Sequence, residues 1–181
     1  MKREGGARFW RAVAAAAVVI GVSACTRSEA APKKDAPATT SPPGAAAAVP
    51  LAAAHVDGKN FRLDFVAEGD CKVGGECRAV IRLEALGEYH INKEYPYKFK
   101  AETKREDVEF LGTDPAGKAT FSKAAGDFKT EGEQKATMTV RFKAGAGGPL
   151  TIMGTYKMSV CSAQNCQLES QPISLDLAVK S

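Results

Sequence analysis

Apolar and polar residues alternate with a period of two along most of the chain from about residue 60. In an extended strand this pattern places every second side chain on the same face, so one face can be buried while the other is solvated. Clusters of glycine, proline and aspartate separate the alternating runs at 68–70, 74–75, 114–117 and 145–149, where turns are expected. The clearest runs are 61–65, 78–85, 95–100, 136–143, 150–160 and 173–179, with short candidates at 108–111 and 119–121.

These runs amount to about seven or eight short strands in about 120 residues, with no helical period among them. They predict an all-β domain over residues 58–181, built as an immunoglobulin-like antiparallel β-sandwich in which two sheets pack face to face. The Cys-Trp-Cys pattern of antibody domains is absent, since the single tryptophan, Trp10, lies near the N-terminus.

The first 24 residues have the pattern of a secretory signal peptide. Residues 1–11 are rich in basic side chains, residues 12–21 (AVAAAAVVIG) are uncharged and apolar, and small residues follow at 22–24. As a helix, this apolar stretch would span about 15 Å, roughly half of a bilayer core, so a permanent transmembrane helix is not expected.

The residues VSAC at 22–25 resemble the lipobox of bacterial lipoproteins. In that family the cysteine is lipidated on its sulfur and becomes the new N-terminus, so the resemblance implies that acyl chains on Cys25 anchor the protein to a membrane. Each buried CH₂ group contributes roughly 0.8 kcal/mol, and several chains together anchor firmly. Thr26, in place of an aspartate, implies by the same analogy the outer membrane, facing the periplasm. The alternative is an ordinary cleaved signal peptide followed by a chance cysteine.

Residues 25–57 are dominated by Pro, Ala, Ser and Thr and contain few large apolar side chains. Such a segment cannot bury enough surface to offset the entropy lost on ordering. A disordered tether is therefore expected between the lipidated cysteine and the β domain, partly extended by its prolines.

The net charge of the chain is carried mostly by its N-terminal segment. The first 25 residues hold four of the 25 basic residues and one of the 21 acidic ones, which leaves 21 basic and 20 acidic residues. A nearly neutral domain lacks the basic patch that nucleic-acid binding requires. No nucleic-acid partner is therefore expected.

Four cysteines remain beyond Cys25, and an even number in an exported chain predicts disulfides. Local pairing, Cys71–Cys77 and Cys161–Cys166, is the simplest arrangement, because each pair flanks a turn between strand-like runs. Crosswise pairing, which would join two hairpin ends, stays open. Structural zinc is a competing interpretation, but its paired ligands usually lie two to four residues apart, which only the second pair matches. No metal or other cofactor is expected.

The run TYKMSVCSAQNCQLESQPISLDLAV at 155–179 resembles the C-terminal part of the N-terminal periplasmic domain of the thiol:disulfide interchange protein DsbD. GEYHINKEYPYKFKAE at 87–102 is also similar to a segment of bacterial domains of this type. The resemblance implies an immunoglobulin-like sandwich with a redox pair, Cys161 and Cys166, that exchanges with a periplasmic thiol-disulfide protein. The spacing of this pair is one residue shorter than the family pattern, and only Pro172 follows it. Cys71 and Cys77 have no counterpart in the resemblance.

An exchange-active pair needs an accessible sulfur and a cation or helix N-terminus that lowers the thiol pKa. Lys157 and Glu169 are the charged residues closest to the pair in sequence, and His90 can approach it only through folding. No Gly-x-Ser-x-Gly nucleophile motif supports a hydrolase. Two functions remain: an envelope accessory protein in thiol-disulfide exchange through Cys161 and Cys166, or a non-catalytic envelope protein whose two disulfides are purely structural.

Overall fold

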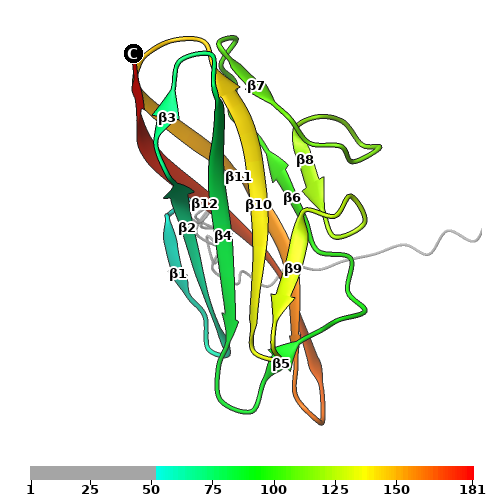
Figure 1. Ribbon diagram of the computed structural model, residues 1–181. Coiled ribbons are helices and arrows are strands. Elements are labelled where there is room, and N and C mark those ends of the chain that lie inside the picture. The colour runs from blue at the N-terminus through cyan, green and yellow to red at the C-terminus, as the bar shows by residue number, and fades with distance from the viewer. Residues whose placement is uncertain (1–51) are drawn as a thin grey trace, which may run out of the picture. The chain divides into compact units, whose positions relative to one another are not determined.

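The computed structural model describes residues 52–181, which form a sandwich of two β-sheets (Figure 1). The first sheet has the strand order β1-β2-β4-β10-β7, with β9 also paired to β10, and the second has β3-β12-β11-β6-β8, with β5 also paired to β11. Residues 52–181 contain no helix that is long and apolar enough to cross a membrane. The strands are β1 (His55–Asp57), β2 (Phe61–Glu68), β3 (Cys71–Lys72), β4 (Glu76–Ala85), β5 (His90–Ile91), β6 (Lys98–Ala101), β7 (Val108–Phe110), β8 (Thr120–Ser122), β9 (Phe128–Glu131), β10 (Lys135–Ala144), β11 (Gly148–Cys161) and β12 (Cys166–Lys180).

The strand order is that of an immunoglobulin-type Greek key. Strands β2, β4 and β10 form the centre of one sheet and β6, β11 and β12 that of the other, as in the ABED and CFG sheets of that fold. Seven of the described strands have four or more residues and five have two or three, so the number expected from the sequence is exceeded only by short segments. The prediction of an all-β sandwich is confirmed.

The core lies between the two sheets and is built from the inward-facing half of each alternating strand. Phe65 of β2 and Phe99 of β6 meet edge to face across the sheets, with ring centroids 5.5 Å apart. Tyr97 stacks on Phe128 at 4.1 Å. Burial of each large apolar side chain stabilises the fold by about 1.5–3 kcal/mol, which makes this interface the main source of stability.

The ordered domain includes residues 52–57, which the composition assigned to the tether. Ala53 bridges Ile173 of β12, the amide of Phe65 donates to the carbonyl of Ala54 at 2.7 Å, and β1 pairs with β2. These contacts use the backbone, so a pattern of side chains does not reveal them. The predicted signal peptide 1–24, Cys25 and the rest of the predicted tether lie outside the described residues.

Gly154 marks a close approach between β11 and β6. A Cβ atom at this position would lie 2.3 Å from the carbonyl oxygen of Lys100 and 2.6 Å from the ring of Phe99. We expect Gly154→Ala to force the two strands apart and to lower the free energy of unfolding by about 1–3 kcal/mol, as measured by urea denaturation. The control is Gly145→Ala, whose Cβ would meet nothing closer than 3.4 Å. Equal losses in both variants would contradict the expectation.

His55 lies on β1 between two carboxylates. Its Nδ1 is 2.7 Å from Oδ1 of Asp64 and its Nε2 is 3.0 Å from Oδ2 of Asp57. The hydrogen bond with Asp64, and then that with Asp57, raises the pKa of His55 above its ordinary value of 6.5. Because the folded pKa is the higher one, the stabilisation is fully present below about pH 6.5 and is lost as the pH rises through the folded value.

An NMR titration of the two histidine rings checks this arrangement. The midpoint of His55 is expected above 6.5, and Asp64→Asn is expected to lower it, because the largest contribution comes from that carboxylate. An unchanged midpoint in Asp64→Asn would show that the pair does not form in solution.

Candidate functional site

Both cysteine pairs form local disulfides. Cys71 is bonded to Cys77 and Cys161 to Cys166, with Cα–Cα distances of 4.8 Å and 4.0 Å. The local connectivity is therefore confirmed over the crosswise one, and no cysteine within residues 52–181 is left as a thiolate for zinc. In the same range, no group of three or more His, Cys, Asp or Glu side chains is arranged to hold a metal ion.

The Cys71–Cys77 disulfide is part of the core and links the two sheets. Cys71 lies on β3 of the second sheet and Cys77 on β4 of the first, and they are 6% and 1% exposed. Cys71 pairs with Val179 near the end of β12, whereas Cys166 begins that strand, thirteen residues away. At about 3.3 Å per residue, the two disulfides are separated by roughly 43 Å along β12. Their surroundings are therefore independent.

The Cys161–Cys166 disulfide closes the hairpin formed by β11 and β12. Their register runs from Gly148↔Val179 to Cys161↔Cys166 without interruption. The alternation along β11 turns Val160 toward the core and Cys161 toward the outer face of the sheet. Cys161 is still only 5% exposed, whereas Cys166 is exposed at the start of β12. Cys166 is therefore more accessible to an incoming thiol than Cys161 is.

Two rows of residues surround the pair on the outer face. Cys161 has His90 of β5 as its partner on one side and Cys166 on the other, and these three residues form the first row. In the second row, Ser159 accepts a 3.3 Å hydrogen bond from the side-chain amide of Asn92 and pairs with Leu168 across the hairpin. Leu168 is 66% exposed, more than any other large apolar residue within 52–181.

The segment before β6 holds these rows together. The backbone amide of Asn92 donates to the backbone carbonyl of Ser159, and the hydroxyl of Tyr97 donates to the same carbonyl. The hydroxyl of Tyr89 donates at 3.2 Å to the side chain of Asn165, in the turn between the two cysteines. Burial raises the pKa of Tyr97 well above its ordinary range, so this hydroxyl stays protonated and acts as a fixed donor. Tyr89 and Tyr97 thus support the site structurally.

The charges nearest in sequence are not the charges nearest in space. Lys157 is on the outer face but four residues from Cys161, or about 13 Å along the strand. Glu169 lies on the inner face of β12, where it accepts hydrogen bonds from the side-chain amides of Gln167 and Gln171. His90 is brought to the pair by the pairing of β5 with β11, which links segments 70 residues apart and which no local pattern reveals.

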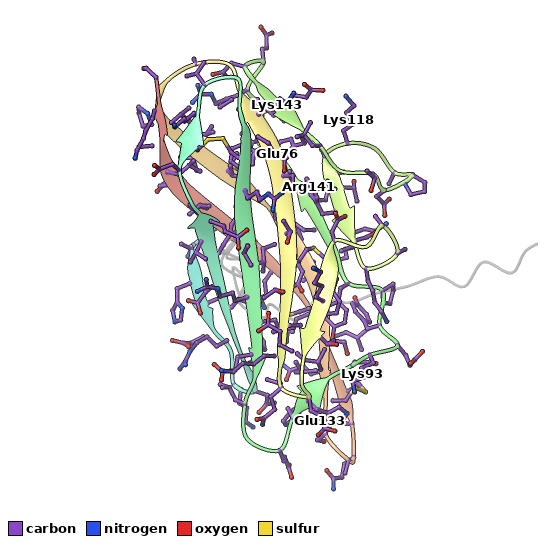
Figure 2. The ribbon with its side chains drawn as sticks, viewed as in Figure 1. Glu76, Lys93, Lys118, Glu133, Arg141 and Lys143 are labelled. Carbon is purple, nitrogen blue, oxygen red and sulfur yellow. A yellow bond between two sulfur atoms is a disulfide. The ribbon has the colours of Figure 1, made fainter. Side chains whose placement is uncertain are left out.

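A hollow of about 410 Å³ opens beside His90. Figure 2 shows Lys93 and Glu133 at this end of the sandwich, close to β5. The hollow gives solvent, or the side chain of a partner, access to the ring of His90. Its other lining residues are Ile91, Asn92, Lys93, Glu94 and Glu133.

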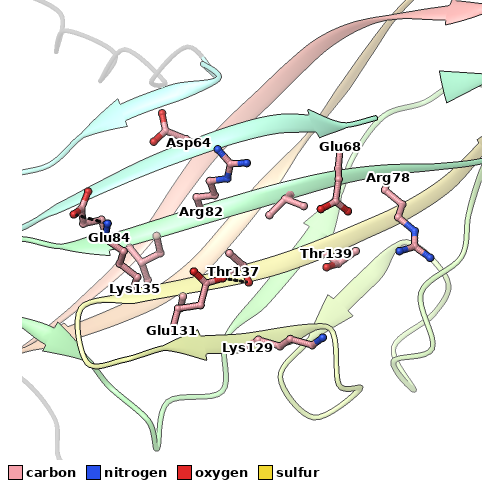
Figure 3. Close-up of a pocket in the computed structure, with 13 residues that line it drawn as sticks. Asp64, Glu68, Arg78, Arg82, Glu84, Lys129, Glu131, Lys135, Thr137 and Thr139 are labelled. Atoms are coloured by element: carbon pink, nitrogen blue, oxygen red, sulfur yellow. Dashed lines mark hydrogen bonds and ion pairs between the residues drawn. The ribbon is translucent and has the colours of Figure 1, made fainter. Parts of the chain in front are cut away.

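A larger hollow of about 650 Å³ lies on the outer face of the first sheet (Figure 3). Four acidic and four basic side chains alternate along it, and several already pair, as Glu84 does with Lys135 at 3.5 Å. Because the charges balance and do not converge on one point, this surface has the character of a solvated face. The charged lining residues are Asp64, Glu68, Arg78, Arg82, Glu84, Lys129, Glu131 and Lys135.

No protein-family model matches the chain, and no curated protein sequence is significantly similar to it. The geometry around Cys161 and Cys166 is therefore the feature of the domain that bears on function.

The difference in exposure predicts which disulfide is reduced first. Under limiting dithiothreitol at neutral pH, thiols are expected to form at Cys161 and Cys166 about tenfold faster than at Cys71 and Cys77, because attack requires an accessible sulfur. Alkylation followed by peptide mass spectrometry measures the order. In urea the two pairs should react at similar rates, and faster reduction of Cys71–Cys77 in the folded chain would refute the assignment.

Proposed function

We propose that the chain is a cell-envelope lipoprotein whose sandwich domain takes part in thiol-disulfide exchange through Cys161 and Cys166. In this proposal Cys25 carries the lipid anchor, the Ala/Pro-rich tether holds the domain away from the membrane, and the exchange occurs on the periplasmic side of the outer membrane. The observation that carries the proposal is the exposed Cys166, which lies outside the core and belongs to a disulfide on the outer face of the sheet.

The unequal exposure of the two cysteines assigns their roles in the exchange. A partner thiolate attacks the Sγ atom of Cys166, a new disulfide forms between the partner and Cys166, and the Cys161–Cys166 bond breaks. The electron pair of the broken bond leaves on Cys161 as a thiolate. A second partner thiolate then resolves the mixed disulfide, so the partner is oxidised and the pair is reduced by two electrons.

The surface beside Cys166 suits a protein partner. Leu168 projects from the same face of β12 two residues away, and an exposed apolar side chain gains free energy when a partner covers it. Between Cys166 and Pro172, no strand within residues 52–181 pairs with the edge of β12 that faces away from β11. An extended segment of a dithiol protein can add to this edge and bring its thiol to Cys166.

The alternative is a non-catalytic envelope protein in which both disulfides are structural. It is favoured by the low exposure of Cys161, and by the position of its bridge at the end of a long hairpin, where cross-linking limits fraying. The two functions differ in one measurable quantity, the reduction potential of Cys161–Cys166.

Equilibration of the purified chain with glutathione buffers measures this potential. A value near about −200 mV is expected for an exchange-active pair, whereas a value below about −300 mV marks a structural bridge and would end the proposal. Cys71–Cys77 in the same sample is the internal control and is expected in the structural range.

Trapping is the complementary measurement for the partner. Cys161→Ser leaves the exposed Cys166 free to hold a mixed disulfide, whereas Cys166→Ser leaves only the buried Cys161. Defined mixed disulfides from an envelope extract are therefore expected with the first variant and much less with the second.

A further inference from the structure

We propose that His90 acts as the electrostatic partner of Cys161 in this exchange, stabilising the thiolate that Cys161 becomes when the disulfide opens. The inference rests on the proposed function and extends it to the control of the leaving sulfur. His90 and Cys161 are directly opposed in the β5–β11 ladder. Side chains of opposed residues lie on the same face with Cβ atoms about 4.5–5.5 Å apart, within reach of an imidazole ring and a sulfur.

The cations on β11 and after β5 lie farther from Cys161 in register than His90 does. Lys157 lies four residues along β11, Lys93 is three residues beyond His90 on the lining of the hollow, and the turn between the cysteines, 162–165, carries no charge. The other titratable groups that line the hollow around the ring are Glu94 and Glu133.

The chemical step places a negative charge next to the ring. Attack on Cys166 expels Cys161 with the electron pair of the broken S–S bond, and a protonated His90 can stabilise this thiolate or give it a proton. In the reverse reaction a neutral His90 takes the proton back while Cys161 attacks the mixed disulfide. Thiols with a lower pKa leave faster, so the positive charge on His90 accelerates opening of the disulfide.

A pH dependence follows from the chemistry of imidazole, the side chain that changes charge between about pH 5 and 8. Once the rate of reduction is divided by the concentration of reductant thiolate, the remaining pH dependence belongs to the protein. Protonation of His90 should raise this corrected rate constant as the pH falls. A change of one unit in the pKa of the leaving thiol alters the rate about threefold, if the leaving-group dependence is as steep as that of the attacking thiol.

The experiment measures the reduction of the full chain by dithiothreitol between about pH 5.5 and 8.5, with thiols at Cys161 and Cys166 followed by alkylation and mass spectrometry. The expected result is a roughly threefold rise toward low pH in the unmodified chain and a flat profile in His90→Asn. His90→Lys keeps a positive charge throughout and is expected to be fast and flat. His55→Asn changes the other histidine of the described domain and should keep the unmodified profile.

A wild-type profile retained in His90→Asn would overturn the role of His90, and so would a flat profile in the unmodified chain. Because small-thiol kinetics need no protein partner, this test is separate from that of the proposed function. A reduction potential in the structural range, together with a pH profile that depends on His90, would overturn the exchange function while leaving the charge effect on Cys161 in place. His90→Gln replaces His90→Asn if the latter does not fold.

Discussion

The pairing of β11 with β12 is the interaction on which the rest of the site depends. Its fourteen register positions carry the sheet from the core at Gly148↔Val179 to the cysteine pair at Cys161↔Cys166. This register fixes the face that each side chain occupies, because a slip of one residue would turn the inner side chains outward and the outer ones inward. The register therefore decides that Val160 is buried in the core while Cys161 lies on the outer face. The β5–β11 pairing then adds His90, and the same hairpin aligns Leu168 with Ser159.

Toward the cysteines the inner face of the hairpin changes from apolar to polar. Ile173 is buried in the core, but the inward positions that precede it are Gln171, Glu169 and Gln167, linked by hydrogen bonds to one another and to Asn60. Burial of amides and a carboxylate contributes far less than burial of apolar side chains, so this end of β12 is held mainly by β11 and the disulfide. Weakly anchored elements open with lower free energy than the core. A site that must admit an attacking thiol is suited to such a place.

The fold could be predicted from the sequence because it depends on a local signal, the period of two, which the buried and exposed positions of β2 and β10 reproduce. The two disulfides could be predicted because short spacing favours local closure. Long-range pairing left no such signal. The pairing of His90 with Cys161 depends on β5 reaching β11, and the placement of residues 52–57 depends on backbone contacts of alanines. The unequal exposure of Cys161 and Cys166 also required the structure, because both follow the same alternating pattern. The sequence of the cysteine segment likewise gave no means of distinguishing its two sulfurs.

The two disulfides of this domain can be compared with each other, because their loops are of nearly equal length. Their sequence separations are six and five, so loop closure stabilises the fold by nearly the same amount, about 2 kcal/mol for each in the chain-entropy model. Any difference in their reduction potentials must then come from the folded surroundings. Those surroundings differ in burial and in charge: Cys71 and Cys77 are enclosed in the core between two sheets, while Cys161 has an imidazole opposite it and Cys166 faces solvent. Burial in apolar surroundings disfavours the thiolate and a neighbouring cation favours it. Under the role proposed for His90, the surroundings push the two pairs in opposite directions: Cys71–Cys77 toward an unreactive structural bridge and Cys161–Cys166 toward one that a thiol opens more readily.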